Sequence, residues 1–120
     1  MQFMFLVISA ENQGNPPQAL YEAMDKHIAK AKADGSLVIT GGLESSAQAT
    51  RVAVANRNVT VKDGPYSEAK EMVGGFAIMK FDTREQAAQA AKDFLQLHAD
   101  TWPEWKGEVE MRQIFMPEDF

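Results

Sequence analysis

The most distinctive local feature of this 120-residue chain is the segment from Asp63 to Gly75. It opens with Asp63-Gly64-Pro65, which is good turn chemistry, because aspartate accepts hydrogen bonds from nearby amides and proline fixes φ. A carboxylate that such a turn holds beside a cleft also suits a general base or a ligand anchor, since loops on a rigid scaffold often carry function. Asp63 is therefore a candidate catalytic residue, with turn capping as the alternative.

The same segment continues with Tyr66, an amphipathic side chain with a hydroxyl, and then with Ser67-Glu68-Ala69-Lys70. The serine and lysine have the spacing of the penicillin-binding enzymes, but the other motifs of that class are missing, so a solvated helical turn is the better interpretation. Substrate-binding candidates in this segment are Tyr66, Glu68 and Lys70. Gly74-Gly75 is a weak signal for a ligand near the backbone and more often eases the start of a strand.

Two further candidates lie outside that segment. His27 falls on the apolar stripe of a predicted helix, where it is either a packed core residue or a catalytic acid–base group. Arg112 shares the polar side of the last predicted strand with Glu110, and we expect it either to clamp an anionic group or to pair with Glu110 or a partner subunit. His98, close to two tryptophans, is expected at the surface or at a helix end.

Apolar patterning predicts the elements that position these residues. A strand at 3–8 is apolar on both faces, which is typical of a central strand. A helix follows Pro17 and ends before Gly35, and a second helix begins after Thr83. Further strands are predicted at 37–39, 51–55, 59–61, 76–81 and 108–115. Asn56 and Asn58 favour a hairpin between the third and fourth strands, with a longer or bulged tip because Arg57 suits a two-residue turn poorly.

This order predicts an α+β fold, a ferredoxin-like βαββαβ core with an inserted β-hairpin, in a single domain over residues 1–120. The segment Asp63-Gly64-Pro65-Tyr66 with Gly74-Gly75-Phe76 resembles the signature of the DGPF branch of the YCII-related family, with tyrosine where phenylalanine is usual. The opening strand, Ala33-Asp34-Gly35 and residues 107–112 extend the resemblance over nearly the whole chain.

The resemblance implies a dimeric α+β barrel in which two sheets enclose clefts, and for some members a histidine and an aspartate of the first helix region as an acid–base pair. It also implies frequent association with sigma factors. Here the spacing does not match that pair, because His27 lies eight residues before Gly35 and Asp34 adjoins it. Independently, the strand at 3–8 needs a cover on its second face, and a second copy related by two-fold symmetry supplies it most simply.

Composition excludes several classes of function. The net charge of -5 opposes binding to nucleic acid, and no apolar run is long enough for a membrane-spanning helix. The absence of cysteine favours a cytoplasmic protein. With no cysteine, no clustered histidines and no dinucleotide-binding fingerprint, we expect no metal and no cofactor.

Two functions remain open. One is a small-molecule enzyme that uses acid–base chemistry in a cleft of the dimer, with Asp63 and His27 as its catalytic residues. The other is a non-catalytic ligand-binding or regulatory module. The position of Asp63 relative to a histidine separates them: a shared cleft favours the enzyme, and residues that lie apart favour the binding module.

Overall fold

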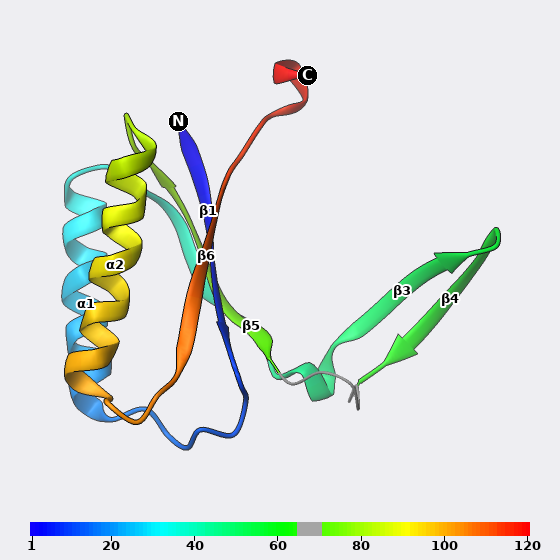
Figure 1. Cartoon of the computed structure of the whole chain (residues 1–120), viewed down its shortest axis with the longest axis horizontal. Helices are drawn as coiled ribbons and strands as arrows, with labels where there is room; N and C mark the ends of the chain where they lie inside the picture. Colours follow the sequence, from blue (N-terminus) through cyan, green and yellow to red (C-terminus); the bar gives the residue numbers. More distant parts are fainter. Residues whose placement is uncertain (65–70) are drawn as a thin grey trace.

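The structure is a computed structural model that describes residues 1–64 and 71–120. It has two layers, with both helices on one face of an antiparallel four-stranded sheet, and a separate two-stranded hairpin that extends away from the helices (Figure 1). The elements are β1 (Gln2–Ser9), α1 (Gln18–Ala33), β2 (Leu37–Gly42), β3 (Thr50–Ala55), β4 (Asn58–Asp63), β5 (Met72–Lys80), α2 (Arg84–Thr101) and β6 (Gly107–Gln113), with short 3₁₀ turns at Ser46–Gln48 and Pro117–Asp119.

The sheet has the strand order β2-β5-β1-β6, so β1 is internal as its two apolar faces predict. Without the hairpin, this is the order of a ferredoxin-like sheet, and the predicted α+β class is confirmed. Phe3 and Phe5 of β1 are buried beneath the helices together with Met79 of β5 and Ala87 of α2. The alternate residues of the same strands face away from both helices.

Local chemistry sets the ends of the helices. Gly35 follows α1 with a φ of 81°, a left-handed conformation that glycine adopts without steric cost. At the start of α2, the Thr83 hydroxyl accepts a hydrogen bond from the Gln86 N–H, and the Gln86 side chain accepts one from the Thr83 N–H. This capping box satisfies amide groups that the first turn of a helix leaves without partners.

The hairpin of β3 and β4, here called the arm, differs from the prediction at its tip. Ala55 pairs directly with Asn58, and Asn56 and Arg57 both have positive φ, 51° and 70°, as in a tight two-residue turn. The prediction of a longer or bulged tip was wrong, because the strand twist imposes this turn even on an arginine. Four valines are 65% to 70% exposed on one face of the arm: Val52, Val54, Val59 and Val61.

The strand predicted at 76–81 begins earlier, at Met72, so Gly74 and Gly75 lie inside β5 rather than at its start. Gly75 pairs with Gly42 of β2, which places two residues without side chains next to each other in the sheet. In the part of the chain that the structure describes, no helix is long and apolar enough to cross a membrane.

Candidate functional site

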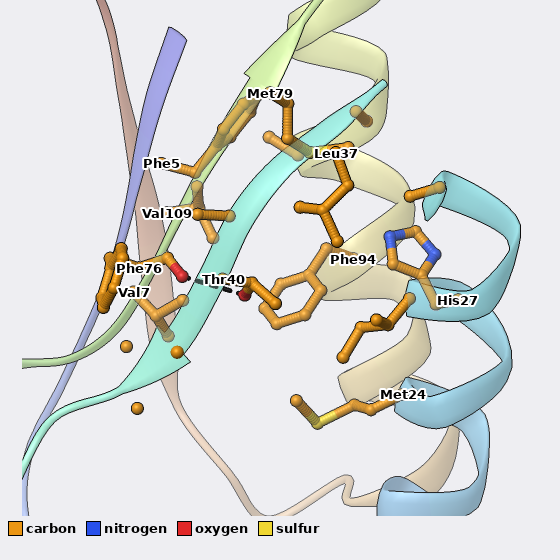
Figure 2. A pocket seen from close by; sticks show the side chains of 18 of the residues that line it. Phe5, Val7, Met24, His27, Leu37, Thr40, Phe76, Met79, Phe94 and Val109 are labelled. Carbon is orange, nitrogen blue, oxygen red and sulfur yellow. Dashed lines mark hydrogen bonds between the residues drawn. The ribbon is translucent and has the colours of Figure 1, made fainter. Parts of the chain in front are cut away.

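A cavity of about 350 Å³ lies between the two helices and the sheet (Figure 2). Most of its wall is apolar. The sheet contributes Phe5, Val7, Leu37, Thr40, Gly41, Gly42, Gly74, Gly75, Phe76, Ala77, Met79 and Val109, and the helices contribute Met24, His27, Ile28, Ala31, Ala90, Ala91, Phe94 and His98. The volume and the mainly apolar lining are typical of small-molecule pockets.

A pair of glycines explains why the sheet side of this space is open. Gly42 of β2 pairs in register with Gly75 of β5, and Gly75 pairs with Val7 on the face that the helices cover, so no side chain fills this part of the wall. In the sequence, Gly74-Gly75 is only a weak signal for a ligand near the backbone. The stronger signal was the second glycine pair, Gly41-Gly42, because the antiparallel pairing of β2 with β5 brings the two pairs together.

Polar side chains in the wall are few. The Thr40 hydroxyl donates a hydrogen bond to the Phe76 carbonyl oxygen at 3.0 Å, so its proton is already used (Figure 2). His27 is half-buried and projects from α1 toward Phe94, with 6.0 Å between the ring centroids (Figure 2). In the described part of the chain, no carboxylate hydrogen-bonds to the His27 imidazole.

His98 occupies the other helix and is only 6% exposed. Its Nδ1 lies 2.9 Å from the carbonyl oxygen of Phe94, one helical turn earlier. The Phe94 and Trp105 rings pack against the imidazole, with centroids 4.7 Å and 4.6 Å away. Of the two places expected for His98, the helix end is confirmed, because it lies in the last turn of α2, and the surface is wrong, because the Trp105 ring packs against it.

The predicted catalytic pair is not assembled within one chain. Asp63 ends β4 at the base of the arm, where its Oδ1 accepts a hydrogen bond from the Thr50 hydroxyl at 2.9 Å, and it is not part of the cavity wall that contains His27. This bond joins the two strands of the arm at their base. Residues 65–70, which follow Asp63-Gly64, lie outside the described residues, so turn capping by Asp63 stays a prediction.

Arg112 lies on the opposite face of the sheet from the cavity. It pairs in register with Met4, on the face that the helices do not cover, and its side chain is well exposed. Its guanidinium lies 3.2 Å from a carboxylate oxygen of Glu110, the ion pair that we considered as the alternative to a ligand clamp. The remaining predicted binding residues, Tyr66, Glu68 and Lys70, lie outside the described residues.

The pKa shifts of the described residues lie away from this cavity. Hydrogen bonds from Ser36 lower the pKa of Asp34 at the end of α1, and the backbone amide of Ser46 lowers the pKa of Glu11 in the loop after β1. Among the described residues, no group of three or more histidines, aspartates and glutamates is placed to hold a metal ion. The described wall of the cavity is therefore mainly apolar, with two imidazoles and without a lysine, arginine or carboxylate.

Comparison with known proteins adds one decisive match. The sequence model of the YCII-related domain matches residues 1–115. The chain belongs to the YCII-related family. Its assignment to the DGPF branch rests on the Asp63-Gly64-Pro65-Tyr66 motif. Comparison of this YCII-related protein with curated protein sequences finds no significant match.

Among solved structures, the chain is similar to the 5-chloro-2-hydroxyhydroquinone dehydrochlorinase of Burkholderia phenoliruptrix AC1100, in complex with 2,5-dihydroxybenzoquinone. The identity is 15%, the comparison covers 100% of both chains, and the TM-score is 0.41. At this distance the likeness says nothing about the ligand or the reaction of the YCII-related protein described here.

Proposed function

We propose that this protein binds a small, neutral, mainly apolar organic molecule in the cavity between its helices and its sheet. The observation that carries the proposal is a space of about 350 Å³ whose wall, in the described part of the chain, contains no lysine, arginine, aspartate or glutamate. A charged ligand would lose its hydration there without gaining a counter-charge. An apolar ligand would instead remove apolar surface from water.

The test uses p-xylene as the probe and methionine methyl groups as reporters. Met24 and Met79 line the cavity, whereas Met4 lies on the other face of the sheet. In protein labelled with ¹³C at the methionine methyl groups, p-xylene is expected to shift the Met24 and Met79 signals in a saturable way and to leave Met4 unchanged. Shifts confined to Met4, or no saturable shift, would contradict the proposal.

A matched pair of variants checks the location. Ala91→Leu places a larger side chain into the cavity wall, and Ala99→Leu makes the same change at an exposed position on the same helix. The first variant should weaken p-xylene binding at least tenfold, because the space is occupied, and the second should leave it unchanged. Equal affinities for both variants would place the probe elsewhere.

Acid–base catalysis on the bound molecule is the second candidate function, and the position of His27 favours it. This imidazole reaches the cavity, remains partly exposed to water, and has no hydrogen-bond partner among the described side chains. An imidazole exchanges protons readily near neutral pH, so it is the side chain in this wall best suited to moving a proton. Asp63 is not part of the cavity wall that contains His27, so the binding function stands first.

The two functions separate through His27→Gln. If the protein only binds, this variant should retain p-xylene affinity within about threefold, because glutamine preserves polarity and most of the volume. If His27 also transfers a proton, incubation of a bound, exchangeable C–H substrate in deuterated water should give deuterium incorporation with wild type and none with His27→Gln. Equal incorporation by both proteins would remove His27 from any catalytic role.

We further propose a homodimer in which the uncovered faces of two sheets meet. The support is the row of partly buried apolar side chains on that face, among them Met4, Leu6 and Ile78. In such a dimer Arg112 and Glu110 line the enclosed space, and Tyr66, Glu68 and Lys70 remain proposed contributors to a cleft at its edge. A regulatory partner such as a sigma factor remains a proposal from family resemblance alone.

A further inference from the structure

His98 is the only buried polar or charged side chain in the described part of the chain, and it lines the cavity. Its neighbours in the wall are carbon-rich, and its ring packs against Phe94 and Trp105. A buried imidazole without a full set of hydrogen bonds is costly, so natural proteins rarely leave one without a reason. Among the described residues only one hydrogen bond to the His98 ring is made, so a molecule inside the cavity, water or ligand, must supply the other.

The known hydrogen bond fixes the state of the ring. Nδ1 lies 2.9 Å from the Phe94 carbonyl oxygen, and a carbonyl only accepts, so Nδ1 carries the proton. In the neutral imidazole, Nε2 is then an acceptor without a proton. No hydrogen bond to Nε2 is made by any other described residue. With the Nδ1 edge turned to the helix backbone and two aromatic rings against the imidazole, the Nε2 edge is the part left to face the cavity.

We propose that Nε2 of His98 accepts a hydrogen bond from a hydroxyl group of the bound molecule. The inference rests on the binding function proposed above and narrows its ligand class to small, neutral, mainly apolar molecules with one hydroxyl group, such as a phenol. The Thr40 hydroxyl donates its proton to the Phe76 carbonyl, and its oxygen keeps lone pairs that can accept a hydrogen bond. Thr40 is exposed, however, so water can satisfy those lone pairs without a ligand.

His27, the other imidazole in the cavity wall, differs from His98 in its exposure to solvent. His27 is only half-buried, so water can satisfy its ring nitrogens, whereas His98 is nearly sealed from solvent. A ligand hydroxyl that leaves water to bind His27 replaces one hydrogen bond with another. The same hydroxyl at His98 satisfies an acceptor that water reaches poorly. We therefore expect His98, rather than His27, to make the protein prefer ligands that carry a hydroxyl group.

Two ligands of nearly equal shape test this. p-Cresol and p-xylene differ by a hydroxyl in place of a methyl group, and the ratio of their dissociation constants is measured for each protein. Relative to wild type, His98→Phe should lower the preference for p-cresol by about fivefold, as loss of one hydrogen bond predicts. Ala99→Phe, the control at an exposed position of the same helix, should leave the ratio unchanged. An unchanged ratio in His98→Phe, or a loss seen in His27→Phe but not in His98→Phe, would overturn the inference.

A second measurement uses wild-type protein and needs no variant to fold. Long-range ¹H–¹⁵N correlation spectra should show the proton of His98 on Nδ1, and p-cresol but not p-xylene should shift the Nε2 resonance. A proton on Nε2 in the free protein would refute the assignment while leaving cavity binding intact. Absence of binding by both molecules to wild type would instead overturn the proposed function, and the ligand class inferred here with it.

Discussion

The carboxylate of Glu11 accepts a hydrogen bond from the backbone N–H of Ser46, with 2.9 Å between Oε1 and the nitrogen. Its other oxygen accepts from the hydroxyls of Ser46 and Ser45, at 3.1 Å and 3.3 Å. These bonds connect the loop after β1 to the 3₁₀ turn that precedes the arm. They lower the pKa of Glu11 below its ordinary value of 4.5, with the Ser46 amide as the main cause.

Because the folded state lowers this pKa, the contribution of Glu11 to stability is present above pH 4.5 and is lost as the pH falls through the folded-state pKa. When the pH is lowered in an NMR titration, the resonance of the Ser46 amide proton should therefore move upfield, with a midpoint below pH 4.5. Glu11→Gln should abolish this titration and leave the arm folded, since glutamine still offers an oxygen to the amide. A Ser46 titration that survives in Glu11→Gln would assign the effect to another group.

Much of the fold follows from local sequence patterns. Two-sided apolar alternation places β1 inside the sheet, Gly35 ends α1, and Thr83 starts α2, all as predicted. These features depend on a few neighbouring residues, so the local sequence is enough to predict them. The tip of the arm was mispredicted because the twist of the paired strands outweighs the poor preference of Arg57 for positive φ.

The site was harder to predict, for a physical reason. The cavity forms where β2 and β5 pair and where two helices cover them, so its wall combines residues that are far apart in the sequence. The predicted place of His27 on the apolar face of its helix agrees with the structure, while its proposed catalytic role stays a prediction. The burial of His98 was not predicted, because it depends on Trp105 packing over it, a contact that helix periodicity does not reveal.

Gly64 is predicted to be required for the base of the arm. Its N–H donates to the Ala49 carbonyl at 2.8 Å, and a Cβ at this position would collide with the backbone carbonyl oxygen of Ser46. Gly64→Ala should lower the free energy of unfolding by about 1–3 kcal/mol, because backbone must move to make room. Gly74→Ala is the matched control, since a Cβ there meets no atom within 4 Å. Similar thermal stabilities for the two variants would show that the backbone at Ser46 can move away from the new Cβ without lowering the free energy of unfolding.

Asp63→Asn tests whether this aspartate serves structure or binding. Asparagine keeps an oxygen for the Thr50 hydroxyl, so stability should change by less than about 0.5 kcal/mol. Because Asp63 lies outside the cavity wall, p-xylene affinity measured at the Met24 methyl signal should not change. If Asp63→Asn keeps its stability but no longer binds p-xylene, Asp63 belongs to the binding site, and a cleft that includes the loop after Asp63 is favoured.

The oligomeric state is the last prediction, and it follows from the two faces of β1. Phe3 and Phe5 are covered by the helices, whereas Leu6 lies on the face without helices and is only partly buried. Burial of that face against a second copy would remove its apolar surface from water. Light scattering at micromolar concentration should therefore give a mass twice the 13.3 kDa of one chain.

Leu6→Asp should convert the proposed dimer to a monomer, because Leu6 pairs in register with Glu110, so the new carboxylate would lie beside a like charge and lose its hydration in the interface. Tyr21→Asp is the control, since Tyr21 is an exposed aromatic residue on α1, away from the proposed interface. It should remain dimeric, and circular dichroism should show both variants folded. A wild-type monomer would refute the dimer, and Arg112 would then face solvent with Glu110 as its only ionic partner among the described residues.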